Sequence, residues 1–424
     1  DRVRRAVAAG KTALNKVMSK GQVDVVVAAV WEIFDPAAGE GDPKGAVGQE
    51  KSVGNLQGSA FRLAREINGA PPYGLLAHVA QRMADLQTMS EMAKFWLEIV
   101  EEVRWHWRQR KPIPRVPEEA APALEFCALH QQLMLINVCI ARLNRKAAHR
   151  KKFSDPDAPG RAPPVVGEDG EARERVGAVC PVSRGLRLLE ADVEMWQPLT
   201  QELPVFTEEL MRENNEMVMK TGSVGAGCQQ LLCDMQAFKA ANPGCSLPDF
   251  VRFYSPADWV TKGCESETEG HLSSRMQEDG NMWAELFERA VPVPAYDQPP
   301  LFDAEHVGEE TVESLATIAP SDLFEQLFAA GMGVEHLSVE IVTDIVTEGD
   351  RSSALYQTMV DTAKYTSALF VRGISPSKVE KICDAYRSLE EMIATSDEQA
   401  ALAAAAEQPG SGSGRSEGAE WTMV

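Results

Sequence analysis

The chain has 424 residues, 44% of them hydrophobic and 25% charged, so it can bury a substantial core over two or three domains. The absence of any run of 18 apolar residues excludes a membrane-spanning helix, and we expect no secretory signal. The net charge of −21 is divided unevenly, because residues 1–200 carry 28 basic and 25 acidic groups whereas residues 201–424 carry 14 and 38. Such an acidic half disfavours nucleic acid and anionic membrane as partners and favours a protein with a basic face.

The sequence begins at Asp1 rather than at Met, so we expect a piece of a longer protein. The eight cysteines lack C-x-x-C spacing, and the seven histidines are dispersed without an H-E-x-x-H motif. These patterns favour reduced thiols in a cytoplasmic protein and give no support to a metal site or a self-contained hydrolase.

The first region, residues 1–146, contains two stretches whose apolar residues recur at spacings of three and four, at 73–111 and 120–145. Pro112 and Pro114 separate the stretches, so the pattern predicts an antiparallel helical hairpin. Residues 147–178 are rich in proline, glycine and charge and offer little to bury, which predicts a disordered linker.

The next region, residues 179–310, begins with a stretch that predicts a short strand or a turn-rich entry. Thr207 is suited to cap a helix whose first turn is acidic, and a helix over 229–241 should stop at the turn Asn242-Pro243-Gly244. Ser246-x-x-Asp249 and Ser255-x-x-Asp258 have the spacing of capping boxes and predict two short helices in tandem.

An exposed polar loop is predicted for residues 261–274, followed by Arg275 and by a helix that begins at Asn281. In the region 311–396 helices are expected at 321–330, 336–347, 351–371 and 376–395, and the tail 397–424 should be disordered. The sequence therefore predicts a mainly α fold: a helical hairpin, a helical catalytic module and C-terminal helices, with long disordered linkers.

Two local motifs have ordinary explanations. Gly10-Lys11-Thr12 resembles the end of a phosphate loop, but Arg5 stands where the motif needs a glycine. The mixed aromatic and basic run 104–111 resembles a nucleic-acid surface, yet cations at a helix C-terminus explain it better.

An arginine in an exposed loop suffices for one class of reaction. A small GTPase holds its own nucleotide and magnesium, and a partner that inserts a guanidinium stabilises the charge that develops on the phosphates. Guanidinium suits this task because it is always charged and offers a planar fork of donors. Arg275 is the candidate for this role because it follows the polar loop and precedes a helix.

One dense run of residues carries a family resemblance. It comprises Phe238-Lys239-Ala240-Ala241-Asn242-Pro243-Gly244, then Phe250, Arg252 and Tyr254-Ser255-Pro256, with Leu272-Ser273 and Arg275-Met276 behind it. Over roughly residues 75–305 the chain resembles the catalytic subunit of the heterodimeric Rab-three GTPase-activating protein. The resemblance implies stimulation of GTP hydrolysis by a Rab GTPase, a larger noncatalytic partner subunit and a role in vesicle trafficking. It implies no cofactor of the chain's own, since the Rab holds GTP and magnesium, and a peripheral place on endomembranes through partners.

The resemblance places two arginines on matching positions. We interpret Arg275 as the better candidate for the arginine finger. Arg252, which lies inside a short helix, is the second candidate, and packing or an ion pair is its more natural role. Further candidates for contacting the GTPase or supporting the site are Lys239, Asn242, Tyr254 and Met276.

Alternatives to this interpretation stay open. Arg275 could instead pair with the acidic surface around it, and the chain could be a Rab exchange-factor component or a noncatalytic Rab-binding scaffold. The segment 295–300 lacks the arginine-rich run of animal members, and the region after Glu310 matches weakly.

Overall fold

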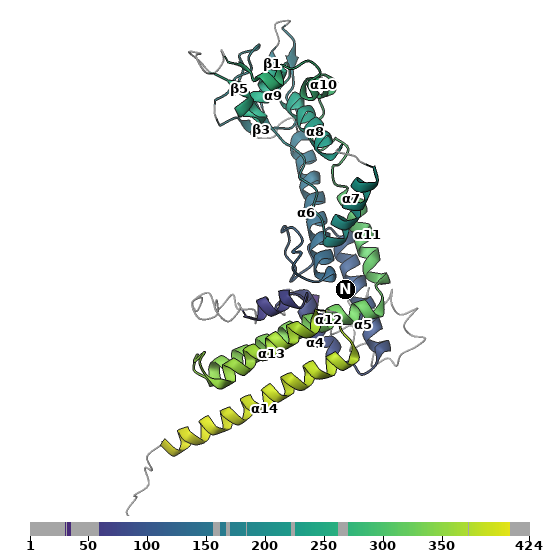
Figure 1. Ribbon diagram of the computed structural model, residues 1–424. Coiled ribbons are helices and arrows are strands. Elements are labelled where there is room, and N and C mark those ends of the chain that lie inside the picture. Colours follow the sequence, from purple (N-terminus) through teal and green to yellow (C-terminus); the bar gives the residue numbers. More distant parts are fainter. Residues whose placement is uncertain are drawn as a thin grey trace, which may run out of the picture. The chain divides into compact units, whose positions relative to one another are not determined.

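In the computed structural model the chain is mainly helical, as predicted, with three pairs of very short antiparallel strands among the described residues (Figure 1). The structure describes residues 30, 32–34, 59–155, 162–166, 170–183, 185–221, 225–261, 270–371 and 373–407. The Gly10-Lys11-Thr12 motif lies outside this part, as do residues 156–161, 262–269 and 408–424. No described helix is long and apolar enough to cross a membrane. The chain divides into two compact units, one of residues 1–95, 125–127 and 318–424 and the other of residues 96–124 and 128–317.

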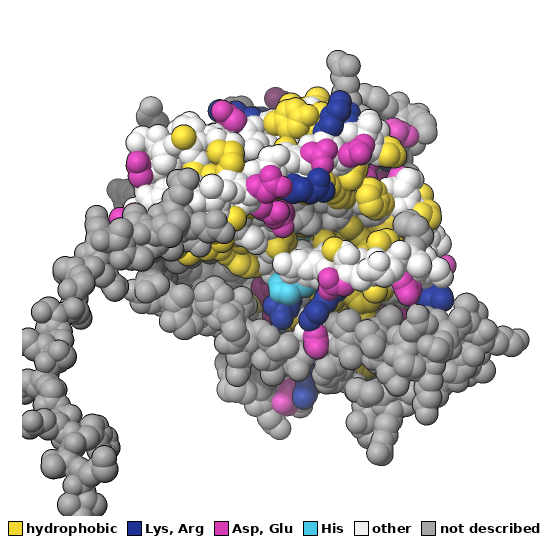
Figure 2. Space-filling model, turned by 90° about the horizontal axis from the view of Figure 1, so that it is seen from below, with side chains coloured by type: hydrophobic (Ala, Val, Ile, Leu, Met, Phe, Trp, Pro, Cys, Tyr) yellow, Lys and Arg dark blue, Asp and Glu magenta, His cyan; other side chains and the backbone are white. Residues whose placement is uncertain are grey.

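The first unit is built from a helix over residues 59–66 and the longer helices α4 (Leu75–Ala84), α12 (Pro320–Val346), α13 (Ala354–Phe370) and α14 (Pro376–Glu407). Helix α12 contacts α4, α13 and α14, and its apolar side chains share one core with residues of α13 and α14. Gly69 permits a close approach, because a Cβ there would stand 2.8 Å from the carbonyl oxygen of Ala329 on α12. Acidic and basic side chains lie between hydrophobic ones on the face shown in Figure 2.

The second unit contains the long helices α6 (Ala128–Ser154) and α11 (Ala304–Thr317), which pack on one another, and the main part of α5 (Met89–Arg108). Two tryptophans of α5 reach α11: Trp96 donates to the carbonyl oxygen of Leu315 (2.9 Å) and Trp107 to Glu309 (2.5 Å). A Cβ at Gly308 would stand 2.2 Å from the ring of Trp107, so the glycine makes room for this ring. Helix α11, against which both α5 and α6 pack, was not among the predicted helices.

The rest of the second unit forms the candidate module, in which short helices and strands lie together at one end of α8 (Figure 1). Helix α8 contacts α10 and β4, whereas α9 contacts η3, β5 and β6. The strands pair as β1 with β2, β3 with β4 and β5 with β6. The elements are α7 (Glu208–Thr221), α8 (Gly225–Ala241), α9 (Leu247–Tyr254) and α10 (Met282–Arg289), the 3-10 turns η3 (Pro256–Asp258) and η5 (Ser274–Met276), and the strands β1 (Val165–Val166), β2 (Ala172–Arg173), β3 (Ala178–Pro181), β4 (Trp196–Pro198), β5 (Trp259–Val260) and β6 (His271–Leu272).

Several predicted boundaries differ in the structure. The helix predicted over 73–111 is two helices, because Thr88 and Glu91 form a capping box that starts α5: Glu91 accepts from the backbone N–H of Thr88 (3.0 Å), and the Thr88 hydroxyl accepts from that of Glu91 (3.2 Å). The second helix of the predicted hairpin begins later than expected and continues to Ser154, inside the predicted linker.

Other differences concern segments predicted as breaks or disorder. Strands β1 and β2 also fall within the predicted linker 147–178. The two helices predicted at 321–330 and 336–347 are the single helix α12. Helix α14 continues through the alanine-rich residues to Glu407, into the predicted disordered tail, which accords with the high helix propensity of alanine.

Candidate functional site

The candidate site is built on α9, whose start the sequence predicted correctly. Ser246 and Asp249 form a capping box, in which the carboxylate of Asp249 accepts from the backbone N–H and the hydroxyl of Ser246 (3.0 and 2.9 Å). The helix packs through Phe250, which is fully buried between the rings of Phe238, Trp283 and Phe287. These aromatic contacts join α8, α9 and α10 into one core and fix the frame that carries the polar residues of the site.

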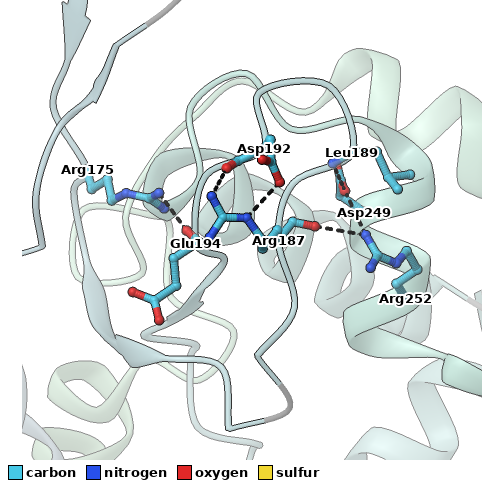
Figure 3. A network of polar contacts seen from close by, with 7 residues as sticks. All are labelled: Arg175, Arg187, Leu189, Asp192, Glu194, Asp249 and Arg252. Atoms are coloured by element: carbon cyan, nitrogen blue, oxygen red, sulfur yellow. Dashed lines mark hydrogen bonds and ion pairs between the residues drawn. The ribbon is translucent and has the colours of Figure 1, made fainter. Parts of the chain in front are cut away.

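Arg252 lies inside this frame. Its side chain is only 3% exposed, and its guanidinium donates to the backbone carbonyl of Arg187 (2.9 Å) and pairs with Asp249 (3.5 Å). Figure 3 shows how Asp249 also accepts from the backbone N–H of Leu189 (2.9 Å), so the pair holds the loop that contains Arg187 and Leu189. A guanidinium in this place is almost fully covered and is bonded to the backbone of a neighbouring loop.

Arg275 has the opposite setting. It lies in η5, directly after β6, and its side chain is 67% exposed. Its Nε donates to Oδ1 of Asp258 (2.7 Å) and its Nη2 donates to Oδ2 of the same carboxylate. The pairing raises the pKa of Arg275, and the hydrogen bonds from Arg275 hold the pKa of Asp258 well below its usual range. The exposure agrees with the expectation for a projecting arginine, and the ion pair agrees with the alternative, a loop arginine paired with an acidic neighbour.

Asp258 is itself held firmly. Its side chain is 7% exposed, and its carboxylate accepts from the hydroxyls of Ser255 (2.6 Å) and Ser273 (2.8 Å) besides Arg275. Its backbone carbonyl accepts from the N–H of Ser273 (2.8 Å), just beyond the pairing of β5 with β6. The second predicted short helix is a single 3-10 turn, and the segment predicted as an exposed loop, residues 261–274, directly follows β5 and contains β6.

Lys239 and Asn242 serve the packing of the module. The ammonium of Lys239 donates to the carbonyl oxygens of Phe287 (2.5 Å) and Ala290 (3.0 Å), at the C-terminus of α10, where a cation suits the helix dipole. The fully buried Asn242 exchanges hydrogen bonds with both backbone groups of Trp196 (2.8 Å each). Both side chains are hydrogen-bonded to partners within the module.

The remaining two candidates flank Arg275 and α9. Met276 is buried beside Asn281, whose amide also donates to the backbone carbonyl of Arg275 (2.6 Å). Tyr254 is 42% exposed, stacks on Phe250 with ring centroids 5.1 Å apart, and hydrogen-bonds to Asp234. Of the six predicted residues, Arg275 and Tyr254 are the two whose side chains reach the surface most.

Comparison with known proteins identifies the region that carries these residues. Residues 171–316 match the family described as Rab3 GTPase-activating protein catalytic subunit. Similar curated proteins carry the same name: the chain is 29% identical over 380 residues to that of Rattus norvegicus, covering 72% of this chain and 49% of the relative. It is 26% identical over 444 residues to that of Homo sapiens (88% and 45%) and 32% identical over 292 residues to that of Danio rerio (56% and 30%).

The chain is similar to these catalytic subunits over part of their length. It spans less than half the length of each of the three. No solved structure matches it. All six predicted site residues, together with Asp249 and Asp258, fall inside the part that matches the Rab3 GTPase-activating protein catalytic subunit family.

One buried arginine in the matched region was not among the predicted site residues. Arg175, in the predicted linker, donates to the carbonyl oxygens of Pro163 (3.1 Å) and Glu194 (2.7 Å) and to the side chain of Asn242 (2.8 Å). Burial lowers its pKa. Arg175 and Arg252 thus hold the loop 187–194 from its two ends (Figure 3). The local sequence, rich in proline and glycine, could not predict this role of Arg175. Its acceptors are mostly backbone oxygens of residues far along the chain.

The described residues offer no other obvious centre for chemistry. No group of three or more His, Cys, Asp or Glu among them could hold a metal ion. A cavity of about 220 Å³ lies between α6 and the segments 199–202 and 295–305, but none of the predicted site residues lines it. Its charged lining is mixed in sign, with Arg142, Arg145 and Lys146 beside Glu202, Asp303 and Glu305.

Proposed function

We propose that this chain stimulates GTP hydrolysis by Rab small GTPases and supplies Arg275 as an arginine finger in trans. One observation carries the proposal: the guanidinium of Arg275 is exposed and is bonded to the buried carboxylate of Asp258. Both residues lie in the region that matches a family of GTPase-activating catalytic subunits. The chain needs no nucleophile or metal for this activity, because the GTPase holds nucleotide and magnesium.

The proposal extends to partners that the name of the family implies. A Rab protein is the substrate, and a larger noncatalytic subunit pairs with the chain in a heterodimer that acts in vesicle trafficking. The complex is cytoplasmic and reaches endomembranes through its partners. These points are carried over from the similar proteins. The chain spans less than half the length of each relative compared, so we state them as proposals.

A second function is favoured by one observation. Arg275 is already paired with Asp258, as expected for an arginine that only stabilises a Rab-binding surface. In that case the chain is a noncatalytic scaffold or a component of an exchange factor, and the module binds the Rab without entering its nucleotide site.

Single-turnover hydrolysis separates the two functions. Rab3 and a panel of other Rab proteins, loaded with GTP, are mixed with the full chain, alone and together with the noncatalytic subunit. We expect wild type to accelerate hydrolysis and Arg275→Ala to lose about a thousandfold or more of that acceleration. Arg289→Ala, which removes an exposed arginine from the end of α10 in the same region, is the matched control and should keep full activity.

The other outcomes decide against the finger. If Arg275→Ala accelerates hydrolysis as well as wild type does, Arg275 has no role in the reaction. If neither protein accelerates hydrolysis but both speed the release of bound GDP from a Rab, the chain acts in nucleotide exchange.

A further inference from the structure

The ion pair between Arg275 and Asp258 has a geometry that leaves one edge of the guanidinium open. Nε and Nη2 face the carboxylate, so one side of the planar group is occupied. Within the part of the chain that the structure describes, Nη1 makes no hydrogen bond, and the side chain is largely exposed. The edge formed by Nη1 and the second N–H of Nη2 can therefore donate two hydrogen bonds to a second partner, such as two phosphate oxygens.

The carboxylate that holds Arg275 is fixed on all sides. Ser273 and Arg275 donate to Oδ1, whereas Ser255 and Arg275 donate to Oδ2. The backbone of Asp258 is bonded to Ser255 on one side and to Ser273 on the other. The long, flexible side chain of Arg275 is thus bonded to a carboxylate whose orientation is fixed.

We propose that Asp258 is the positioning residue of the arginine finger, holding Arg275 with its open edge directed away from the protein. This inference rests on the proposed function. Fixing the guanidinium before the GTPase binds removes the entropy cost of ordering an arginine side chain in the complex and presents the donors where charge develops in the transition state. The carboxylate leaves the arginine charged, because guanidinium does not lose its proton in proteins.

The ionisation of Asp258 suits this role. Its hydrogen bonds with Arg275 and the two serines hold its pKa well below the usual range, so the carboxylate stays charged at every pH used to assay GTP hydrolysis. The opposite interpretation is an inhibitory contact, in which Asp258 withholds Arg275 from the GTPase. The two interpretations predict opposite effects when the charge of Asp258 is removed.

The decisive variant is Asp258→Asn, which keeps the size of the side chain but removes its charge. Steady-state hydrolysis with GTP-loaded Rab3 or the most responsive Rab gives kcat and KM separately. We expect kcat to fall about 10- to 100-fold while KM changes little. A misplaced Arg275 guanidinium slows the chemical step but leaves the binding of the Rab unchanged. Asp279→Asn, at an exposed aspartate just after η5, is the matched control and should leave both constants unchanged.

A double-mutant cycle distinguishes positioning from support of the fold. In an Arg275→Ala background, Asp258→Asn should cause no further loss, because there is no guanidinium left to place. A further loss in that background means that Asp258 acts through the fold and overturns the inference. An increase in kcat for Asp258→Asn alone establishes the inhibitory contact and overturns it as well.

A gentler variant covers the case in which Asp258→Asn unfolds the module. Ser273→Ala removes one hydrogen bond to the carboxylate and keeps its charge, and we expect about a fivefold lower kcat with Arg275 present and no change without it. Equal kcat for Ser273→Ala and wild type, in a folded protein, contradicts the inference. If Arg275→Ala loses activity while both of these variants keep it, only the inference fails and the proposed function stands.

Discussion

Two Ser-x-x-Asp motifs hold an arginine each, and they do so in opposite surroundings. Asp249 and Arg252 are both buried, and their bonds end on the backbone of the loop 187–194. Asp258 is buried too, but its partner Arg275 lies at the surface with one edge open. The same local motif therefore supports the fold in one place and presents a charged group in the other, and the difference lies in whether the arginine itself is covered.

The largest expected effect separates the two arginines by stability. Arg252→Ala leaves the buried carboxylate of Asp249 without its cation, so the free energy of unfolding should fall by about 3–5 kcal/mol. Arg275→Ala removes an exposed partner, and Asp258 keeps the hydroxyl donors Ser255 and Ser273, so the loss should be smaller. Urea denaturation followed by circular dichroism measures both variants against wild type. Equal losses in the two variants contradict the division into a supporting and a presenting arginine.

A pH titration tests another carboxylate of the frame. Burial raises the pKa of Asp234, which hydrogen-bonds to Tyr254, to about 6. Because the folded state binds this proton more tightly than the unfolded state does, its contribution to stability is full below about pH 4 and is lost as the pH rises through about 6. Asp258, whose pKa is lowered, contributes in the opposite sense and loses its contribution only in strong acid.

Asp234→Asn isolates this effect because the amide keeps a polar partner for Tyr254. Between pH 4 and pH 7 the stability of the variant should rise relative to wild type by about 2–3 kcal/mol. Free energies of unfolding measured in urea at each pH provide the check. Parallel curves for the two proteins exclude a raised pKa at Asp234.

The smallest expected difference concerns the two serines. Ser246→Ala removes the cap of a true helix and should lower the free energy of unfolding by about 1 kcal/mol. Ser255 precedes only a 3-10 turn, and in Ser255→Ala the carboxylate of Asp258 keeps its donors Ser273 and Arg275. The free energy of unfolding should therefore fall by less. Thermal unfolding of both variants checks the order, and a greater loss for Ser255→Ala reverses it.

Local signals in the sequence predicted the elements that depend on neighbouring residues. The caps of α7, α9 and α10, at Thr207, Ser246 and Asn281, are all present. The mainly α fold also followed from apolar periodicity. The start of α5 at Thr88 was missed although its T-x-x-E spacing was available, because the apolar pattern continued across it.

Features that depend on distant partners could not be predicted. Helix α12 continues through residues 331–335, between the two predicted helices, where a Cβ at Gly333 would stand 3.4 Å from the Cβ of Ala64 in the first unit. The ion pair of Arg275 with Asp258 joins residues 17 positions apart across a strand pair, and spacing alone gives no indication of it. Sequence reasoning thus proposed Arg275 but saw Asp258 only as a helix cap.

The pairing of β5 with β6 determines where Arg275 stands. Trp259 pairs with Leu272 and Val260 with His271. The position of the backbone just before η5 is therefore set by this strand pairing and not by the segment that joins the two strands. Closing a longer or shorter connection between two paired strands changes the free energy little. Insertions or deletions between Val260 and His271 should therefore leave the guanidinium in place, whereas a one-residue slip of the strands turns Ser273 away from Asp258 without any change in composition.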